Sequence, residues 1–203
     1  MDKSVEKYKG LAKKLFLNKE KLIADLKGQA TADSQTGLLN RRGFDKFMES
    51  NMDKKNRDFA IFMIDIDHFK KFNDDYGHKK GDDVIVQVAD RLKVNSRTGD
   101  VLGRYGGEEF IVMISRPPES DIELKKMADR YVNSFRESGD NITISLGFTR
   151  YYNSLDVNKW EKTMRRADQA LYQAKESGRN RSEFINYIEA NDLTNNITEF
   201  RND

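Results

Sequence analysis

Compact apolar runs mark the strands that we expect after residue 30. The runs at 58–67 and 141–151 predict two buried strands. The run at 100–114 contains Gly106 and Gly107, and it predicts two short strands joined by a tight glycine turn.

The segments between and beside these strands are predicted to be helical, because apolar residues recur there at three- and four-residue steps. We expect Gly77 to break one helix and Gly178 to end the last, which has about six turns. A new helix is expected after Gly81, with Asp82 or Asp83 as its N-cap. The expected helical segments are 40–50, 68–76, 82–94, 119–138 and 157–177.

The order strand, helix, strand, strand, helix, strand predicts an α+β fold with a βαββαβ core. In this split-βαβ arrangement, a central antiparallel sheet is covered by helices on one face. We expect residues 31–185 to form this domain, and the tail at 186–203 carries no motif that we can interpret.

The first 30 residues are rich in lysine, and their apolar residues form one seam on a helix, interrupted by Lys19. An amphipathic helix that lies on the chain's own domain explains this pattern as well as the end of a dimerising coiled-coil stalk does. The seam residues are Val5, Tyr8, Ala12, Leu15, Leu22 and Leu26.

Length, charge and cysteine content narrow the class of protein. With 203 residues, the chain suits one domain with an extension or two small domains. A net charge of +2 argues against general DNA or RNA binding, and the absence of cysteine excludes disulfide bonds. No apolar run approaches the ~20 residues that a membrane-spanning helix needs, and no signal-peptide core is present. We expect a cytoplasmic chain without a membrane segment, either on its own or as part of a larger sensor protein.

Two clusters of acids are expected to meet at the end of the central strands. Asp65 and Asp67 close the first strand, and Glu108 and Glu109 follow the glycine turn. Converging carboxylates and phosphate oxygens are what Mg²⁺ or Mn²⁺ requires. Asp67 alone is better explained as a cap of the next helix, whereas Asp65 ends an apolar strand, where a charge needs a function.

The stretch RYGGEEF places two glycines and two adjacent acids in a strand region, although both features weaken strands. Gly106 and Gly107 have no side chain, so a bulky ligand can approach the backbone closely and the N–H groups are exposed to phosphate. Arg104 flanks the turn, and Lys70 and Lys71 lie at an expected helix start, which favours phosphate binding. We therefore interpret the turn as a metal–phosphate site.

Several motifs together resemble those of the GGDEF-domain diguanylate cyclases, from Asp33 to Arg181. RYGGEEF resembles the family signature in its GGEEF form, IDIDHFKKFNDDYGHKKGDDVI the nucleotide-binding stretch, and ADQALYQAKESGRN the closing helix. DSQTGLLNRR resembles the opening motif, with Gln35 in place of the usual leucine. We expect this departure to cost some packing and to leave the chemistry unaffected.

The resemblance implies a fold like that of nucleotidyl cyclases and polymerase palms, and a specific reaction. In the family, each domain binds one GTP, and two domains face each other as a homodimer. The 3′-hydroxyl of each GTP attacks the α-phosphate of the other, which yields cyclic di-GMP and two pyrophosphates. The chain is therefore expected to act in bacterial signalling.

The resemblance also implies roles around the metal site. Asp65, Glu108 and the Ile66 carbonyl would bind Mg²⁺ or Mn²⁺, two ions in each half-site. Glu108 is in addition the candidate general base, Glu109 would support the second ion or the phosphates, and Lys70 would stabilise charge on the phosphates.

The implied substrate contacts include a guanine-selective pair. Asp82 can accept N1–H and N2–H of guanine and Asn73 can donate to O6, whereas adenine offers the reverse pattern. Singly, Asp82 is better explained as an N-cap and His78 as part of a surface turn, but their spacing within the motif favours nucleoside binding. The implied substrate-binding residues are Asn73, His78, Asp82, Arg104, Gly106, Gly107, Lys175 and Arg179, the last two for the γ-phosphate.

The tetrapeptide RTGD, Arg97 to Asp100, matches the family's RxxD inhibitory site, where cyclic di-GMP stops turnover. Such tetrapeptides are common by chance and are usually surface ion pairs. The fixed spacing before GGEEF favours the inhibitory site here.

Two other functions stay open. A catalytically inactive member of the family would act as a receptor for cyclic di-GMP or GTP, but such domains lose metal acids or glycines that are all present in this sequence. A cyclase that makes a mixed or adenine dinucleotide is disfavoured by Asp82.

Overall fold

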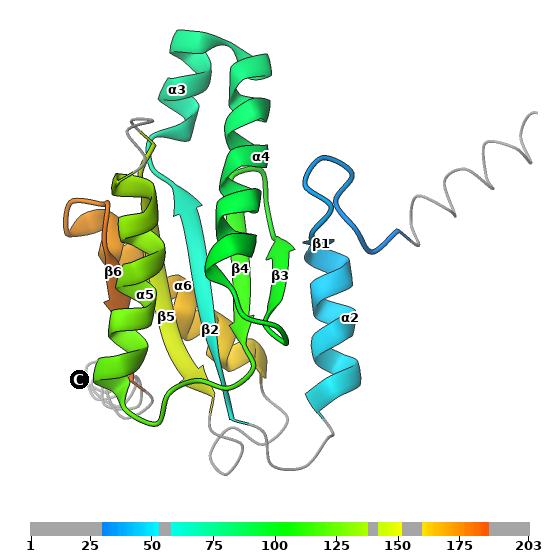
Figure 1. Cartoon of the computed structure of the whole chain (residues 1–203), viewed down its shortest axis with the longest axis vertical. Helices are drawn as coiled ribbons and strands as arrows, with labels where there is room; N and C mark the ends of the chain where they lie inside the picture. Colours follow the sequence, from blue (N-terminus) through cyan, green and yellow to red (C-terminus); the bar gives the residue numbers. More distant parts are fainter. Residues whose placement is uncertain (1–29, 53–57, 138–141, 152–159, 187–203) are drawn as a thin grey trace, which may run out of the picture. The chain divides into compact units, whose positions relative to one another are not determined.

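The computed structural model describes residues 30–52, 58–137, 142–151 and 160–186 (Figure 1). The chain divides into two compact units, Met1–Thr31 and Ala32–Asp203, and the second contains the sheet and the helices around it. The expected helix at 1–30 and the tail at 186–203 fall almost entirely outside the described residues, so those two expectations stay predictions.

A mixed sheet of six strands forms the centre of the domain. The strands are β1 Leu39–Asn40, β2 Phe59–Ile66, β3 Val101–Arg104, β4 Glu109–Ile114, β5 Ile144–Tyr151 and β6 Ser182–Phe184. Their order is β1-β3-β4-β2-β5-β6, with β2 antiparallel to both β4 and β5. The outer pairs, β1 with β3 and β5 with β6, are parallel. The predicted α+β class with a central antiparallel sheet is confirmed.

Helices cover both faces of this sheet. The described residues include α2 Arg41–Met52, α3 Phe69–Tyr76, α4 His78–Asn95, α5 Asp121–Arg136 and α6 Trp160–Glu176. Apolar residues of α4 and α5 pack in one core, and those of α2 and α6 pack in a second core. In Figure 1, α4 and α5 lie in front of the strands and α6 passes behind them. The expectation of helices on one face is therefore wrong, because β2 and β5 are buried at every position and need cover on both sides.

The expected helix start after Gly81 is also wrong. α4 begins at His78, and Gly77 separates it from α3 with a φ of 83°, a conformation that favours glycine. Asp82 therefore lies inside the helix and does not serve as its N-cap.

Two edge strands were not predicted, because β1 has 2 residues and β6 has 3, which is too few to form an apolar pattern.

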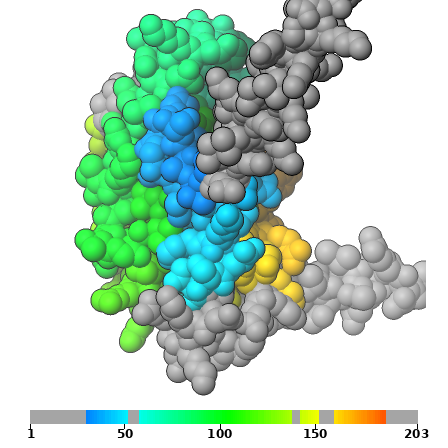
Figure 2. Space-filling view, turned by 90° about the vertical axis from the view of Figure 1, so that its right-hand side faces the viewer, coloured from blue at the N-terminus to red at the C-terminus, as the bar shows by residue number. Residues whose placement is uncertain are grey.

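The segment that leads from residue 32 to β1 lies on the surface between α2 and the green part of the chain that includes α4 (Figure 2). None of the helices in the described ranges is long and apolar enough to cross a membrane.

Candidate active site

Asp65 lies near the end of β2 and is buried, with 8% of its surface exposed. The register of β2 and β4 sets Asp65 opposite Glu109, and the Ile66 N–H donates to the Glu108 carbonyl over 3.3 Å. Backbone pairing therefore brings together the residues of the expected metal site.

A cation from α6 joins this acid cluster. The Lys175 ammonium lies 2.9 Å from the Asp65 carboxylate. Burial raises the pKa of Asp65, Lys175 opposes that effect, and the charges of Glu108 and Glu109 raise the pKa further. The cluster therefore carries excess negative charge and favours cations.

The oxygen donors of the cluster suit a hard divalent cation. Asp65 and Glu108 offer carboxylates and Ile66 offers a main-chain carbonyl, which are ligand types that Mg²⁺ and Mn²⁺ prefer. Among the residues that the structure describes, no group of three or more Asp, Glu, His or Cys side chains could hold a metal ion. An ion would therefore need other oxygens as well, such as those of a triphosphate, and Lys175 would have to release Asp65.

The glycine turn between β3 and β4 is held by its own backbone. The N–H groups of Tyr105 and Gly106 donate to the Glu109 carbonyl over 2.8 and 3.2 Å. A Cβ atom at Gly106 would clash with a Glu109 carboxylate oxygen, whereas one at Gly107 would meet nothing within 4 Å. Gly106 therefore lies against the Glu109 side chain and uses its N–H within the turn, which differs from our expectation that this amide is exposed to phosphate. Gly107 faces open space and stays a candidate for close ligand approach.

Arg104 anchors the turn to the segment before β1. Its guanidinium donates to the Gly107 carbonyl over 3.0 and 2.7 Å, to Asp33 over 3.3 Å and to the Gln35 side chain over 2.7 Å. Gln35 in turn donates to the Asp82 carboxylate over 3.1 Å. The expectation that Gln35 leaves the chemistry unaffected stays a prediction, and the structure adds that its amide contacts two of the candidate substrate-binding residues.

Asn73 lies against the first turns of α4, beside the residue that precedes Asp82. Its Oδ1 atom is buried without a hydrogen-bond partner. A Cβ atom at Gly81 would clash with that oxygen, so the glycine permits the close approach of Asn73. The structure thus brings Asn73 against the residue next to Asp82, the other candidate base-binding residue.

Three further candidates lie at the ends of helices. Lys70 and His78 are exposed on the first turns of α3 and α4, and Arg179 is half-buried in the turn after α6. Within the described ranges, no hydrogen bond or ion pair joins these side chains to the acid cluster. Their substrate roles stay predictions.

Asp67 has a structural role that the sequence analysis missed. Its carboxylate accepts hydrogen bonds from the Thr143 and Ser145 hydroxyls over 2.7 and 2.6 Å, and from the Asn180 N–H over 3.0 Å. It does not cap α3, whose N-cap is His68 in the left-handed conformation. Asp67 therefore ties the end of β2 to β5 and to the turn after α6. Its partners are 76, 78 and 113 residues away, so no local pattern could reveal them.

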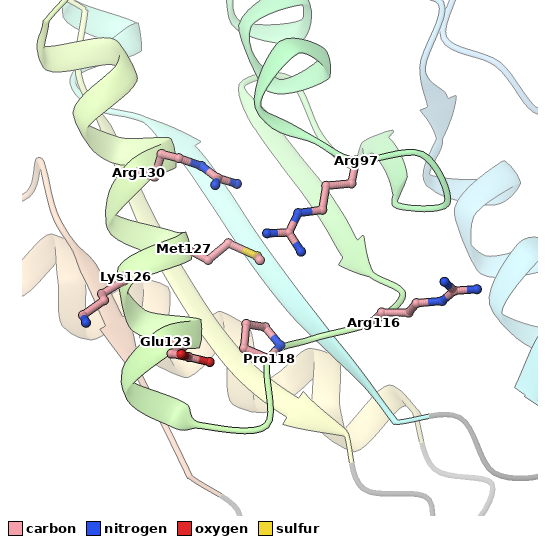
Figure 3. Close-up of a pocket in the computed structure, with 7 residues that line it drawn as sticks. All are labelled: Arg97, Arg116, Pro118, Glu123, Lys126, Met127 and Arg130. Atoms are coloured by element: carbon pink, nitrogen blue, oxygen red, sulfur yellow. The ribbon is translucent and has the colours of Figure 1, made fainter.

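A separate groove of about 450 Å³ lies between α5 and the turn before β3. Arg97 and Arg130 point toward the same hollow from these two elements (Figure 3). Asp100 is not among the residues that line the groove. Its carboxylate accepts the N–H groups of Arg97 and Ser115 over 2.8 and 3.1 Å. The lining residues are Arg97, Arg116, Pro118, Glu123, Lys126, Met127 and Arg130.

Comparison with known proteins assigns the chain to one family. The family model described as "Diguanylate cyclase, GGDEF domain" matches residues 30–181. The chain belongs to this GGDEF family, and the resemblance seen in its motifs is confirmed.

Individual relatives agree with this assignment. The probable diguanylate cyclase DgcC of Escherichia coli (strain K12) is 36% identical over 163 residues, which covers 78% of this chain and 44% of the relative. Diguanylate cyclase DgcM of the same strain is 35% identical over 167 residues, which covers 80% of this chain and 40% of the relative. This chain therefore spans less than half the length of these relatives.

A solved structure shows the same fold. The coiled coil and GGDEF domain of DgcB from Caulobacter crescentus, in complex with c-di-GMP, aligns with a TM-score of 0.67 and 28% identity. The alignment covers 90% of this chain and 100% of that one.

Proposed function

We propose that this chain is an active diguanylate cyclase, which condenses two GTP molecules into cyclic di-GMP and two pyrophosphates. The observation that carries the proposal is the meeting of Asp65, Glu108 and Glu109 at one end of the β2–β4 pair, with Lys175 bound to Asp65. A buried acid with a raised pKa, beside other acids and a cationic side chain, is typical of a functional site.

The guanine base would bind at the junction of α3 and α4. The Asp82 carboxylate would accept hydrogen bonds from N1–H and N2–H, and the Asn73 amide would donate to O6. His78, exposed at the first position of α4, would contact the nucleoside. Because adenine presents the reverse donor pattern, these residues favour GTP over ATP.

The triphosphate would extend from this junction toward the acid cluster. Lys175, once it releases Asp65, would bind the γ-phosphate together with Arg179, four residues further along the chain. Lys70, on the first turn of α3, would stabilise charge on the phosphates.

The acid cluster would hold the cofactor. Asp65, Glu108 and the Ile66 carbonyl would bind Mg²⁺ or Mn²⁺, two ions in each half-site, and Glu109 would support the second ion or the phosphates. The ions supply Lewis-acid stabilisation of the phosphoryl oxygens.

The reaction requires two such half-sites, which face each other in a homodimer. Glu108 would accept the proton of the 3′-hydroxyl of one GTP while that oxygen forms a bond to the α-phosphorus of the other. The bond from that phosphorus to the β-phosphate oxygen breaks, and pyrophosphate leaves. The same exchange in the opposite direction closes the cyclic dinucleotide.

Product inhibition would act at the groove beside α5. Arg97 and Arg130 present two guanidinium groups to one hollow, which suits a ligand with two phosphates. Asp100 holds the turn that carries Arg97, and its remaining lone pairs are left for guanine N–H groups.

The alternative function is that of an inactive receptor for cyclic di-GMP or GTP. It is disfavoured because Asp65 and Glu108 are both present and lie together. GTP turnover in Mg²⁺ across a range of protein concentrations, with ATP as control and product mass as readout, tests the proposal. Formation of cyclic di-GMP supports it, whereas binding without turnover at concentrations where the chain is dimeric supports the receptor.

A further inference from the structure

Gln35 bridges two parts of the candidate site that are far apart in sequence. Its Nε2 donates to the carboxylate and to the main-chain carbonyl of Asp82, each over 3.1 Å. Its Oε1 accepts from the Arg104 guanidinium over 2.7 Å. The segment that carries Gln35 lies beside the part of the surface that includes α4 (Figure 2). One side-chain amide therefore connects α4 with the glycine turn.

The chemistry of the two partners fixes the orientation of this amide. The Arg104 guanidinium only donates hydrogen bonds, and an ionised carboxylate only accepts them. Rotation of the amide by half a turn would set its NH₂ group against the guanidinium and its oxygen against the carboxylate. An apolar residue at position 35 could satisfy neither partner.

The contact restricts a side chain that is otherwise free to rotate. Asp82 is exposed on the first turns of α4, and an exposed carboxylate without a partner samples several rotamers. A carboxylate offers about four lone-pair sites, so one hydrogen bond from Gln35 leaves places for the two N–H groups of guanine. Pre-ordering of the carboxylate lowers the entropy cost of binding the base.

Arg104 extends the connection to the phosphate side of the site. The same guanidinium that bonds Gln35 also donates to the Gly107 carbonyl over 3.0 and 2.7 Å. The turn and the Asp82 carboxylate are therefore connected through one pair of side chains, Gln35 and Arg104.

We propose that Gln35 is a positioning residue for guanine recognition, which holds the Asp82 carboxylate for the base and links it through Arg104 to the glycine turn. This inference rests on the proposed function, because it requires that Asp82 receives guanine.

The test compares Gln35→Leu and Gln35→Glu with the wild type. Leucine removes both contacts, whereas glutamate keeps an acceptor for Arg104 and removes the donor to Asp82. Gln87→Leu, at an exposed position of α4, is the matched control. The probe is 3′-deoxy-GTP, which lacks the attacking hydroxyl, and its inosine counterpart, which lacks the 2-amino group. Calorimetry in Mg²⁺ measures the affinity of each protein for both probes.

We expect both Gln35 variants to bind 3′-deoxy-GTP about two- to ten-fold more weakly, the range for partly exposed hydrogen bonds. They should also lose part of the preference for the guanine probe over the inosine probe, because Asp82 is then less ordered for the 2-amino group. In turnover assays, KM for GTP should rise more than kcat falls. Gln87→Leu should match the wild type, and circular dichroism checks that each variant folds.

Each contrary result has a distinct meaning. Equal affinity in the wild type and Gln35→Leu, or tighter binding by Gln35→Leu, overturns the positioning role alone. An equal loss of affinity for both probes also overturns it, since that pattern indicates a general structural effect. Should Gln35→Leu fail to fold, the same comparison is decided by Gln35→Glu. If the wild type does not bind 3′-deoxy-GTP at all, that result contradicts the proposed function and, with it, the positioning role of Gln35.

Discussion

The ammonium group of Lys175 lies 2.9 Å from the carboxylate of Asp65 and joins the last turn of α6 to the end of β2. In the proposed reaction, both groups change partners, since Lys175 moves to the γ-phosphate and Asp65 to the divalent cation. The ion pair therefore joins, in the free protein, two charged groups that the substrate complex would use separately. The pair with Lys175 offsets part of the cost of burying the Asp65 carboxylate in the free protein.

Loss of either central acid should abolish GTP turnover. Asp65→Asn or Glu108→Gln removes one charge from the cofactor site and keeps the shape of the side chain, so the fold should survive. The measurement is cyclic di-GMP formation, with circular dichroism on the same samples. Asp168→Asn, at an exposed position of α6, is the control and should retain activity. Turnover by a folded Asp65→Asn protein would contradict the assignment.

Asp65 should also make the metal-free protein less stable at neutral pH. Burial raises its pKa in the folded chain, and Glu108 and Glu109 add to this effect against Lys175. The folded state therefore binds the Asp65 proton more tightly than the unfolded state does. The resulting stabilisation is complete below the ordinary Asp pKa of about 4 and is lost as the pH rises through the raised value.

Asp65→Asn tests this sign, because asparagine is neutral at every pH. At pH 7 without divalent metal, the variant should have a higher Tm than the wild type, and the difference should shrink as the pH falls toward about 4. Thermal unfolding across this pH range gives the result. A lower Tm for the variant at pH 7 would show that the Lys175 pair outweighs burial.

Local patterns predicted those parts of the fold in which a single segment determines its own structure. β2 was predictable because all 8 of its residues are buried and all except Asp65 are apolar. The start of α4 was not, because Gly77 and Gly81 look alike in sequence and only Gly77 has a positive φ. Gly81 lies inside the helix for a reason that only Asn73, on another helix, reveals.

The same distinction applies to the candidate site. Asp65 and Glu108 could be predicted to meet, because hairpin geometry and strand pairing bring them together. Gln35 and Asp67 could not be interpreted correctly, because their partners are distant in the chain. Gln35 contacts residues 47 and 69 positions away, and Asp67 contacts one 113 positions away.

Turnover should depend on dimerisation, because two half-sites must face each other before either GTP reacts. Specific activity should rise with protein concentration until the dimer saturates. If the N-terminal seam dimerises the chain, deletion of residues 1–28 should shift the curve to higher concentration. Activity and sedimentation are measured on the same dilution series. Specific activity that stays flat well below the dimer Kd would argue against paired half-sites.

Gly81→Ala should impair guanine binding more than folding. The new Cβ atom would clash with Asn73 Oδ1 and lie 2.9 Å from its Cγ, so the Asn73 side chain must move. Alanine favours a helix interior over glycine by up to about 1 kcal/mol, which offsets part of the strain. We expect a small change in Tm and a rise of roughly ten-fold in KM for GTP. Asp83→Ala, an exposed neighbour, is the control, and an unchanged KM in folded Gly81→Ala would remove Asn73 from the base site.

Arg97→Ala should relieve product inhibition and leave the chemistry intact, because the groove and the acid cluster share no residue. The Arg97 guanidinium can donate two parallel hydrogen bonds to a phosphate and stack on a base. Its removal should therefore cost roughly 1.5–3 kcal/mol of binding free energy, or about ten- to a hundred-fold in cyclic di-GMP affinity. Calorimetry with cyclic di-GMP measures the affinity, and progress curves measure the inhibition. The wild-type curve should flatten early, whereas that of Arg97→Ala should not. Arg165→Ala, at an exposed position of α6, should behave as the wild type. If the wild type binds no cyclic di-GMP, or if Arg97→Ala changes neither affinity nor curve shape, the groove is not a product site and the RTGD stretch only holds a surface turn.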